Sequence, residues 1–253
     1  MSERPLILVS NDDGFDAPGV LALQEALREM ADVYVVAPER EQSAKSHSIT
    51  LHHPLRFRQI SERSFAVDGT PADCVYVAYF LENFLPKRPD LVVSGINHGP
   101  NLGSDVYYSG TVAAAREGAL RGTPSIAFSS AGLDMASAAL FAPTFASRLL
   151  GLPAQEQPVL LNVNFPASAP KGVRATKLGM RLYSDGVEVR DDPRGRHYLW
   201  IGGPGDLEHA PMAGSDTEAV DEGFVSVTPL SLQATQPDHF DIARKVAGGE
   251  QEA

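Results

Sequence analysis

The chain has 253 residues, which suits one large domain or one domain with an appendage, and its hydrophobic fraction of 43% allows a full core. With 32 acidic against 21 basic residues the net charge is −11, so the chain repels polynucleotides and shows no basic stripe to bind them. The apolar run near the start, about five residues long, is too short for a membrane span or a secretory signal. A single cysteine excludes an internal disulfide. We expect a cytoplasmic protein without membrane attachment.

The first two-thirds of the chain alternates strand and helix patterns. Short, fully apolar runs predict buried strands, and apolar residues at helical spacing predict helices. In chain order the predicted elements are a strand at 6–10, a helix at 17–30, a strand at 32–38, two paired extended segments at 48–60 and 64–69, a helix at 70–85, a strand at 89–95, a helix at 109–122, a strand at 124–130, a helix at 135–150 that accommodates Pro143, and a strand at 158–166. This alternation predicts an α/β fold in which helices cover both faces of a parallel sheet.

The last third of the chain has a different pattern. Glycine and aspartate turn residues separate extended segments over 172–203, which predicts hairpins. A strand follows at 222–232 and a short helix at 237–249, and the tail from residue 248 is expected to fray. We therefore divide the chain into a core at 1–170 and an extension at 171–253.

Two adjacent carboxylates, Asp12 and Asp13, follow the first predicted strand in the stretch Asn11-Asp12-Asp13-Gly14. In open parallel sheets ligands bind beyond the carboxyl ends of the strands. Two neighbouring negative charges are costly there unless a cation neutralises them, and Mg²⁺ prefers oxygen ligands of this kind. The alternative is a simple turn in which Asn or Asp caps the helix that follows.

The loop after the strand at 89–95 is rich in glycine and asparagine. Asn97 offers a neutral carbonyl oxygen, a sensible further metal ligand beside two carboxylates. Ser109, Gly110 and Thr111 open the next helix, whose free N–H groups and dipole suit a phosphate. The alternatives are an ordered loop with turns and, for Ser109, ordinary helix capping.

The charged segment 37–48 follows the second strand. Ser43 is a candidate hydroxyl ligand, and Lys45 and His47 are candidates for phosphate contact, although a solvated loop is the favoured interpretation of the charged residues. His98, next to Asn97, is the one other histidine worth testing. The chain contains no G-x-x-x-x-G-K-[ST], G-x-G-x-x-G or G-x-S-x-G motif, so ATP, NAD and serine-hydrolase chemistry lack their usual signatures.

Long segments of the chain closely resemble the survival protein E (SurE) family of metal-dependent 5′-nucleotidases. The resemblance is carried, in order along the chain, by ILVSNDDG, APG, VVAPEREQS, GTPADCV, DLVVSGINHGPNLGSDVYYSGTVAAAREG, DPRG and DEGFVSVTPL. It implies a Rossmann-like three-layer α/β core with a mostly parallel sheet, a β-hairpin extension, and a C-terminal segment that joins subunits into homodimers or homotetramers.

The same resemblance implies the site residues. One divalent metal ion per subunit, Mg²⁺ or Mn²⁺, is expected on Asp12, Asp13, Ser43 and Asn97, with the two aspartates as the catalytic residues. The substrate phosphate is expected near Asn11, Asn97, Ser109, Gly110 and Thr111. The implied substrates are nucleoside 5′-monophosphates and also 3′-monophosphates, with short polyphosphate as a side activity.

The mechanism expected from these residues is metal-assisted hydrolysis, in which the ion polarises the phosphoryl group and acidifies a water molecule. One aspartate is mainly a ligand and the other is a candidate proton acceptor, while direct attack by an aspartate stays open. An aspartyl phosphatase of the haloacid dehalogenase kind is a rival, but it requires D-x-D and the carboxylates here are adjacent. A rival of another class is a nucleotide-binding sensor without turnover.

Overall fold

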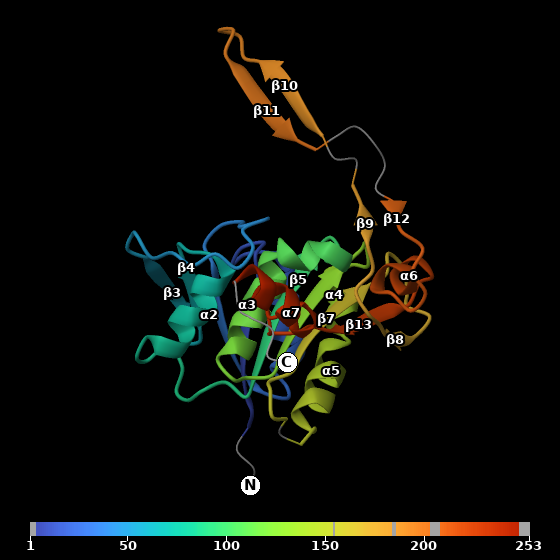
Figure 1. Ribbon diagram of the computed structural model, residues 1–253. Helices are drawn as coiled ribbons and strands as arrows, with labels where there is room; N and C mark the ends of the chain where they lie inside the picture. Colours follow the sequence, from blue (N-terminus) through green and yellow to red (C-terminus); the bar gives the residue numbers. More distant parts are fainter. Residues whose placement is uncertain (1–3, 154, 184–185, 203–207, 248–253) are drawn as a thin grey trace.

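The computed structural model describes residues 4–153, 155–183, 186–202 and 208–247. A nine-stranded sheet forms its centre, in the order β3-β4-β2-β1-β5-β6-β7-β13-β8 (Figure 1). The strands are β1 (Leu6–Ser10), β2 (Asp32–Pro38), β3 (Phe57–Ser61), β4 (Ser64–Val67), β5 (Leu91–His98), β6 (Ser125–Ser130), β7 (Leu160–Phe165), β8 (Val173–Ala175) and β13 (Val225–Pro229). All neighbouring pairs are parallel except β3 with β4 and β13 with β7. The predicted mostly parallel α/β fold is therefore confirmed.

Helices cover both faces of this sheet, as the alternation of β1 requires (Figure 1). Ile7 and Val9 pack in one apolar cluster with residues of α1 (Pro18–Leu27), α4 (Met135–Ala139) and α5 (Ala142–Leu150). Leu8, which points to the other face, packs with α2 (Pro71–Phe80) and α3 (Gly110–Leu120). Successive side chains of a strand point to opposite faces, so the fully apolar run at β1 is what two covered faces demand. The result is the three-layer arrangement that the sequence predicts.

The prediction of one helix over 135–150 is wrong, because the structure has two helices there, α4 and α5. The chain leaves helical hydrogen bonding after α4 and resumes it at α5, which carries Pro143 in its first turn. Proline has no N–H to donate and clashes with the preceding turn, so it kinks or breaks a helix from inside but is well tolerated at a helix start.

The extended segment predicted at 48–60 is a strand only from Phe57, where β3 pairs antiparallel with β4. Upstream, Thr50 bonds instead to the Asp73 carboxylate at the start of α2, through its N–H at 2.8 Å and its hydroxyl at 2.6 Å. Asp73 and Thr70 also cap α2 reciprocally. Residues 50–56 therefore serve as a strap over the start of that helix.

The predicted hairpins of the last third are present. β10 (Val187–Asp191) pairs antiparallel with β11 (His197–Ile201), and this pair projects from the body as an arm (Figure 1). At its base β9 (Arg181–Leu182) pairs with β12 (Glu208–His209). The terminal helix is η2 (Pro237–His239) followed by α7 (Phe240–Val246). The tail from residue 248 lies outside the described residues.

Among the described residues three elements were not predicted: the 3₁₀ turn η1 (Gly103–Tyr107), the short strand β12 and the short helix α6 (Asp216–Asp221). The division at residue 170 stays a prediction. Beyond it, β8 and β13 complete one edge of the central sheet, so the extension and the core share one sheet. No helix within the described ranges is long and apolar enough to cross a membrane.

Candidate active site

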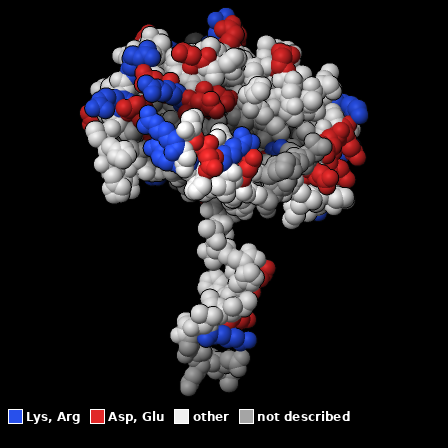
Figure 2. All heavy atoms as spheres, turned by 90° about the horizontal axis from the view of Figure 1, so that it is seen from above, with Lys and Arg blue, Asp and Glu red and all other residues white. Residues whose placement is uncertain are grey.

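The carboxyl ends of β1, β2 and β5 meet at one edge of the sheet because these strands are parallel neighbours. A cleft of about 860 Å³ opens there, and five of the predicted site residues line it: Asp12, Asp13, Ser43, Asn97 and Ser109. Figure 2 looks onto this face, where acidic and basic side chains lie close together and the arm extends away from the body.

The cleft is strongly acidic. Six carboxylate residues line it, Asp12, Asp13, Asp16, Glu39, Glu41 and Asp105, against one arginine among the described residues, Arg40. A phosphate would be repelled by this charge unless a cation were bound beside it. The electrostatics of the cleft therefore favour an anionic substrate only together with a metal ion.

The turn after β1 is built by Asn11. Its side-chain amide donates to the carbonyl of Gly14 at 2.7 Å, and Gly14 has a φ of +107°, which favours glycine. Asn11 is fully buried, and its Oδ1 has no hydrogen-bond partner among the described residues. The turn is tied to the segment after β2, because the Gln42 N–H donates to the Asp12 carbonyl at 2.8 Å. Asn11 thus lies behind the cleft rather than in its lining.

Asp12 is buried against the start of α3. The Thr111 hydroxyl donates to its Oδ1, and a Cβ at Gly110 would lie 2.7 Å from the Asp12 Cβ. Burial, together with the neighbouring charge of Asp13, raises the pKa of Asp12 to about 6, even though the hydroxyl and backbone N–H of Thr111 oppose the rise. Gly110 and Thr111 are themselves buried, so they reach the cleft through Asp12.

Asp13 is more open to solvent than Asp12. Its Oδ2 accepts the backbone N–H of His98 at 3.1 Å, which links the turn after β1 to the end of β5. Burial raises the pKa of Asp13, the charge of Glu41 adds to this, and the His98 N–H opposes it. Two adjacent carboxyls with raised pKa values are an arrangement that a bound cation would relieve.

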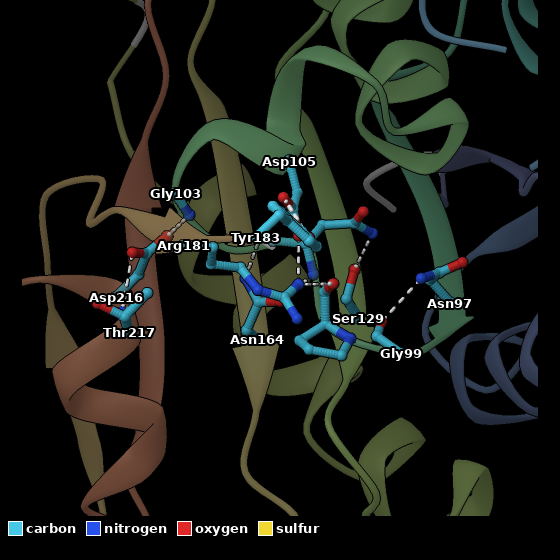
Figure 3. A network of polar contacts seen from close by, with 12 residues as sticks. Asn97, Gly99, Gly103, Asp105, Ser129, Asn164, Arg181, Tyr183, Asp216 and Thr217 are labelled. Carbon is cyan, nitrogen blue, oxygen red and sulfur yellow. Dashed lines mark hydrogen bonds and ion pairs between the residues drawn. The ribbon is translucent and has the colours of Figure 1, made fainter. Parts of the chain in front are cut away.

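Asn97 and Ser43 complete the predicted ligand set. The Asn97 side-chain N–H donates to the Gly99 carbonyl at 2.7 Å, which leaves Oδ1 as the free acceptor of the amide (Figure 3). The exposed Ser43 hydroxyl donates to Glu41 Oε1 at 2.7 Å, so its oxygen lone pairs are available. Asn97 directly follows a register shift in the pairing of β5 with β6, between Ser94 and Asn97, and it lines the cleft.

The donor chemistry fits a hard divalent cation. No group of three or more His, Cys, Asp or Glu within the described ranges is arranged to hold a metal. A site at the two aspartates therefore requires the neutral oxygens of Asn97 and Ser43. Carboxylate, amide and hydroxyl oxygens are ligands that suit Mg²⁺ and Mn²⁺.

The start of α3 is the remaining predicted part. Ser109 caps the helix, because its Oγ accepts the N–H of Val112 at 3.1 Å, and it also lines the cleft. The capping interpretation and the phosphate interpretation are compatible, since an accepting hydroxyl still has its own proton to donate. Eleven residues of α3 direct the positive end of the helix dipole at this point.

The charged residues of the segment after β2 are placed differently from one another. His47 Nε2 lies 2.9 Å from Glu117 Oε2 on α3, and neither it nor Lys45 lines the cleft. Ser46 attaches the same segment to the turn before α3. Its N–H donates to the Tyr108 carbonyl at 2.9 Å, and its hydroxyl donates to the Tyr107 carbonyl at 2.6 Å. His47 thus holds the Ser43 loop in place.

Among the cleft residues that sequence reasoning missed are Asp105, Tyr108 and Tyr183. Asp105 and Tyr108 lie inside the motif that carries Ser109, but nothing in their local pattern marks them. Tyr183 lies far along the chain, in the region predicted only as hairpins. The Tyr183 hydroxyl donates to the Asp105 carboxylate, and Arg181 pairs with the same carboxylate (Figure 3).

The loop between β5 and α3 is fixed from three sides. The Asn101 amide donates to Ser129 Oγ on β6 at 2.8 Å, and the Asn101 N–H donates to Asn164 Oδ1 on β7 at 2.8 Å. Asp216, at the start of α6, accepts the Gly103 N–H at 3.0 Å (Figure 3). Burial raises the pKa of Asp216, and the backbone N–H groups that it accepts oppose the rise. The cleft wall is therefore rigidly supported.

Comparisons with known proteins agree with this architecture. A family model described as "Survival protein SurE" matches residues 7–185. The chain is 55% identical over 249 residues to "5'-nucleotidase SurE" of Sorangium cellulosum, and the match covers 96% of each chain. It is 50% identical over 241 residues to the protein of that name in Gemmatimonas aurantiaca, with 92% of this chain and 94% of that one covered. The crystal structure of the SurE protein from Aquifex aeolicus superposes with a TM-score of 0.83 at 40% identity, covering 96% of this chain and 100% of that one. With a family model over most of its length and relatives at half identity, the chain belongs to the survival protein SurE family.

Proposed function

We propose that this chain hydrolyses nucleoside 5′-monophosphates to nucleoside and phosphate, with one divalent cation, Mg²⁺ or Mn²⁺, bound per chain. Its curated relatives are named 5′-nucleotidase, and the chain is a 5′-nucleotidase of that family. The observation that carries the metal-dependent part is the pair Asp12 and Asp13, two carboxyls with raised pKa values beside the start of α3 in one acidic cleft.

The cation would be held by Asp12, Asp13, Ser43 and Asn97, which line the same cleft. When bound, it supplies charge neutralisation for the phosphate, polarisation of the phosphoryl group and activation of a water molecule. The remaining work falls to the side chains and backbone of the protein.

The start of α3 supports binding of the phosphate. Its dipole and the Ser109 hydroxyl offer positive charge and a donor where negative charge develops on the phosphoryl oxygens. Because these groups are already fixed by the Val112 bond and by the docked segment 46–48, they need little reorganisation during the reaction. Asn11 supports this end of the site through the turn that it builds. We also propose that the phosphate lies close to Gly110 and Thr111.

The two aspartates differ in environment and so in role. Asp12 is locked by Thr111 and buried, which suits a fixed ligand. Asp13 keeps one oxygen on the His98 N–H and is more open to solvent, which suits a group that takes a proton from the attacking water. Direct attack by an aspartate would leave an aspartyl phosphate, and mass spectrometry after substrate trapping separates the two routes.

The test is phosphate release from AMP and GMP with Mg²⁺ or Mn²⁺, followed by EDTA. We expect turnover that chelation abolishes, and Asp12→Asn to lower kcat at least about a hundredfold while calorimetry shows weakened Mn²⁺ binding. Leu21→Ala, at an exposed position of α1, is the control. Turnover that survives EDTA refutes the metal, and nucleotide binding without turnover in any metal indicates the sensor. Nucleoside 3′-monophosphates and short polyphosphate in the same assay test the proposed side activities.

We also propose that the chain forms a homodimer or homotetramer through the arm. A two-stranded hairpin alone is marginally stable in water. The arm nevertheless exposes large apolar side chains on both faces: Val187, Val189, Leu199 and Ile201 share one face through the pairs Val187–Ile201 and Val189–Leu199, and Trp200 lies on the other. Ile201 is 92% exposed and Trp200 58%. A second copy of the chain is the partner that would cover this surface.

A further inference from the structure

Two tyrosine rings stand open in the cleft beside the proposed phosphate position. Tyr108 is 66% exposed and Tyr183 is 52% exposed, and both line the cavity that Asp12 and Asp13 line. Large aromatic rings in a polar, water-filled cleft lose the benefit of burial, so their presence requires an explanation. Neither ring has a place in the chemistry of the phosphate.

Both tyrosines are held by one residue, Asp105. The Tyr183 hydroxyl donates to the Asp105 carboxylate, 2.7 Å from Oδ1 and 2.8 Å from Oδ2 (Figure 3). The Tyr108 N–H donates to the Asp105 backbone carbonyl at 2.9 Å, and so does the N–H of Ser109 at 3.0 Å. Both tyrosines are therefore tied to Asp105, Tyr183 through its hydroxyl and Tyr108 through its backbone, and Tyr108 directly precedes Ser109, the cap of α3.

Arg181 fixes the Tyr183 side of this arrangement. Its guanidinium pairs with the Asp105 carboxylate, and these two side chains are only 11% and 15% exposed. The guanidinium carbon also lies 5.5 Å from the centroid of the Tyr183 ring, so protein backs one side of the ring. Burial and the bond to Asp105 raise the pKa of Tyr183 to about 12, so the phenol keeps its donated proton at neutral pH. The ring is held in one position before any ligand arrives.

We propose that Tyr108 and Tyr183 form a subsite that stacks the planar base of a nucleoside monophosphate, and that Asp105 and Arg181 position it. This inference rests on the proposed function, since the phosphate end of the same ligand would lie at the start of α3. Stacking on aromatic rings accepts any base, because every base has a π face. The subsite therefore selects nucleotides over simple phosphate esters and discriminates weakly among the bases.

The test compares AMP with ribose 5-phosphate, which keeps the phosphate and sugar but lacks the base. We expect the wild type to prefer AMP, and Tyr183→Ala to lower the ratio of the two kcat/KM values about tenfold, the effect of losing one stacked ring. Tyr183→Phe keeps the ring and should retain most of the ratio, whereas Asp105→Asn, which loosens the ring, should lower it. Tyr76→Ala, at a 41% exposed tyrosine of α2 outside the cleft, should leave the ratio unchanged.

The outcomes separate this inference from the proposed function. If Tyr183→Ala lowers both kcat/KM values equally, or neither, the ring does not bind the base and the subsite is refuted. If the wild type hydrolyses neither ester, the proposed function fails, and the ratio of the two dissociation constants from calorimetry still tests the subsite. An AMP preference in binding that Tyr183→Ala removes supports it even then.

Discussion

Gly110 is the position at which a single added methyl group should lower the activity by more than the loss of stability explains. A Cβ there would lie 2.7 Å from the Asp12 Cβ, 2.9 Å from Asp12 Oδ2 and 3.0 Å from the Pro71 Cγ. Atoms at such distances must separate by several tenths of an ångström, so Gly110→Ala pushes the start of α3 and the Asp12 carboxylate apart. The Thr111 bond to Asp12 is the contact that this displacement stretches.

The expected magnitudes follow from that geometry. Overpacking by one methyl costs about 1–3 kcal/mol, and up to about 1 kcal/mol returns because alanine is the better helix former. The net loss of up to about 2 kcal/mol corresponds to a fall in Tm of roughly 4–8 °C in a chain of this size. A misplacement of about an ångström costs about a hundredfold in rate, so moving Asp12 by several tenths of an ångström should lower kcat/KM roughly tenfold.

Gly118→Ala is the matched control. It lies on the same helix, and its Cβ would meet the Val92 Cγ2 at 2.6 Å, so it overpacks the core without touching Asp12. Thermal unfolding and AMP hydrolysis with Mn²⁺ are measured for both variants. We expect similar losses of Tm but a large loss of kcat/KM only for Gly110→Ala. A Gly110→Ala enzyme with near-wild-type kcat/KM would refute the view that the close approach of α3 sets the geometry of Asp12.

Two further predictions concern the surroundings of the site. Burial raises the pKa of Glu117, but hydrogen bonds from His47 and Arg121 outweigh burial and leave the pKa below its ordinary value. The ionised carboxyl therefore stabilises the fold at pH values above its unfolded pKa, and this stabilisation is lost as the pH falls through its folded pKa. The Tm difference between wild type and Glu117→Gln should therefore be larger at about pH 7 than at about pH 3, and a difference independent of pH would contradict this. Ile201→Glu, on the face of the arm that carries the four aliphatic side chains, should lower the mass measured by light scattering toward that of one chain, with Glu188→Gln on the opposite face of the arm as control; a wild type that is already monomeric would contradict the role of the arm.

The fold was largely predictable because its signals are local. A buried, apolar strand such as β1 indicates that both faces of the sheet are covered. Thr70 followed by Pro71 predicts the start of α2. The α4–α5 break was missed because the apolar spacing continues through it and only Pro143 hints at an interruption. The helix α6 is too short to show a period of its own.

The candidate site divides in the same way. Asp12, Asp13 and Asn97 follow strand ends, and the rule that parallel strands present their carboxyl ends at one edge places them together. No such rule reaches Tyr183, because its place in the cleft depends on a bond to Asp105, 78 residues away in the sequence. Equally, no pattern shows that His47 turns to Glu117 rather than to the cleft, since spacing does not say which way a loop side chain points.

The position of β13 has a consequence for how the chain assembles during its synthesis. β8 is made earlier, yet it lies outside β13 and pairs with it, so it has no partner in the sheet until Val225–Pro229 has left the ribosome. Until then the edge of β7 stays open, presenting unpaired backbone groups to any other extended chain nearby. A nascent or truncated product that stops before residue 225 is therefore prone to aggregate by edge-to-edge pairing, and the last strand closes the sheet.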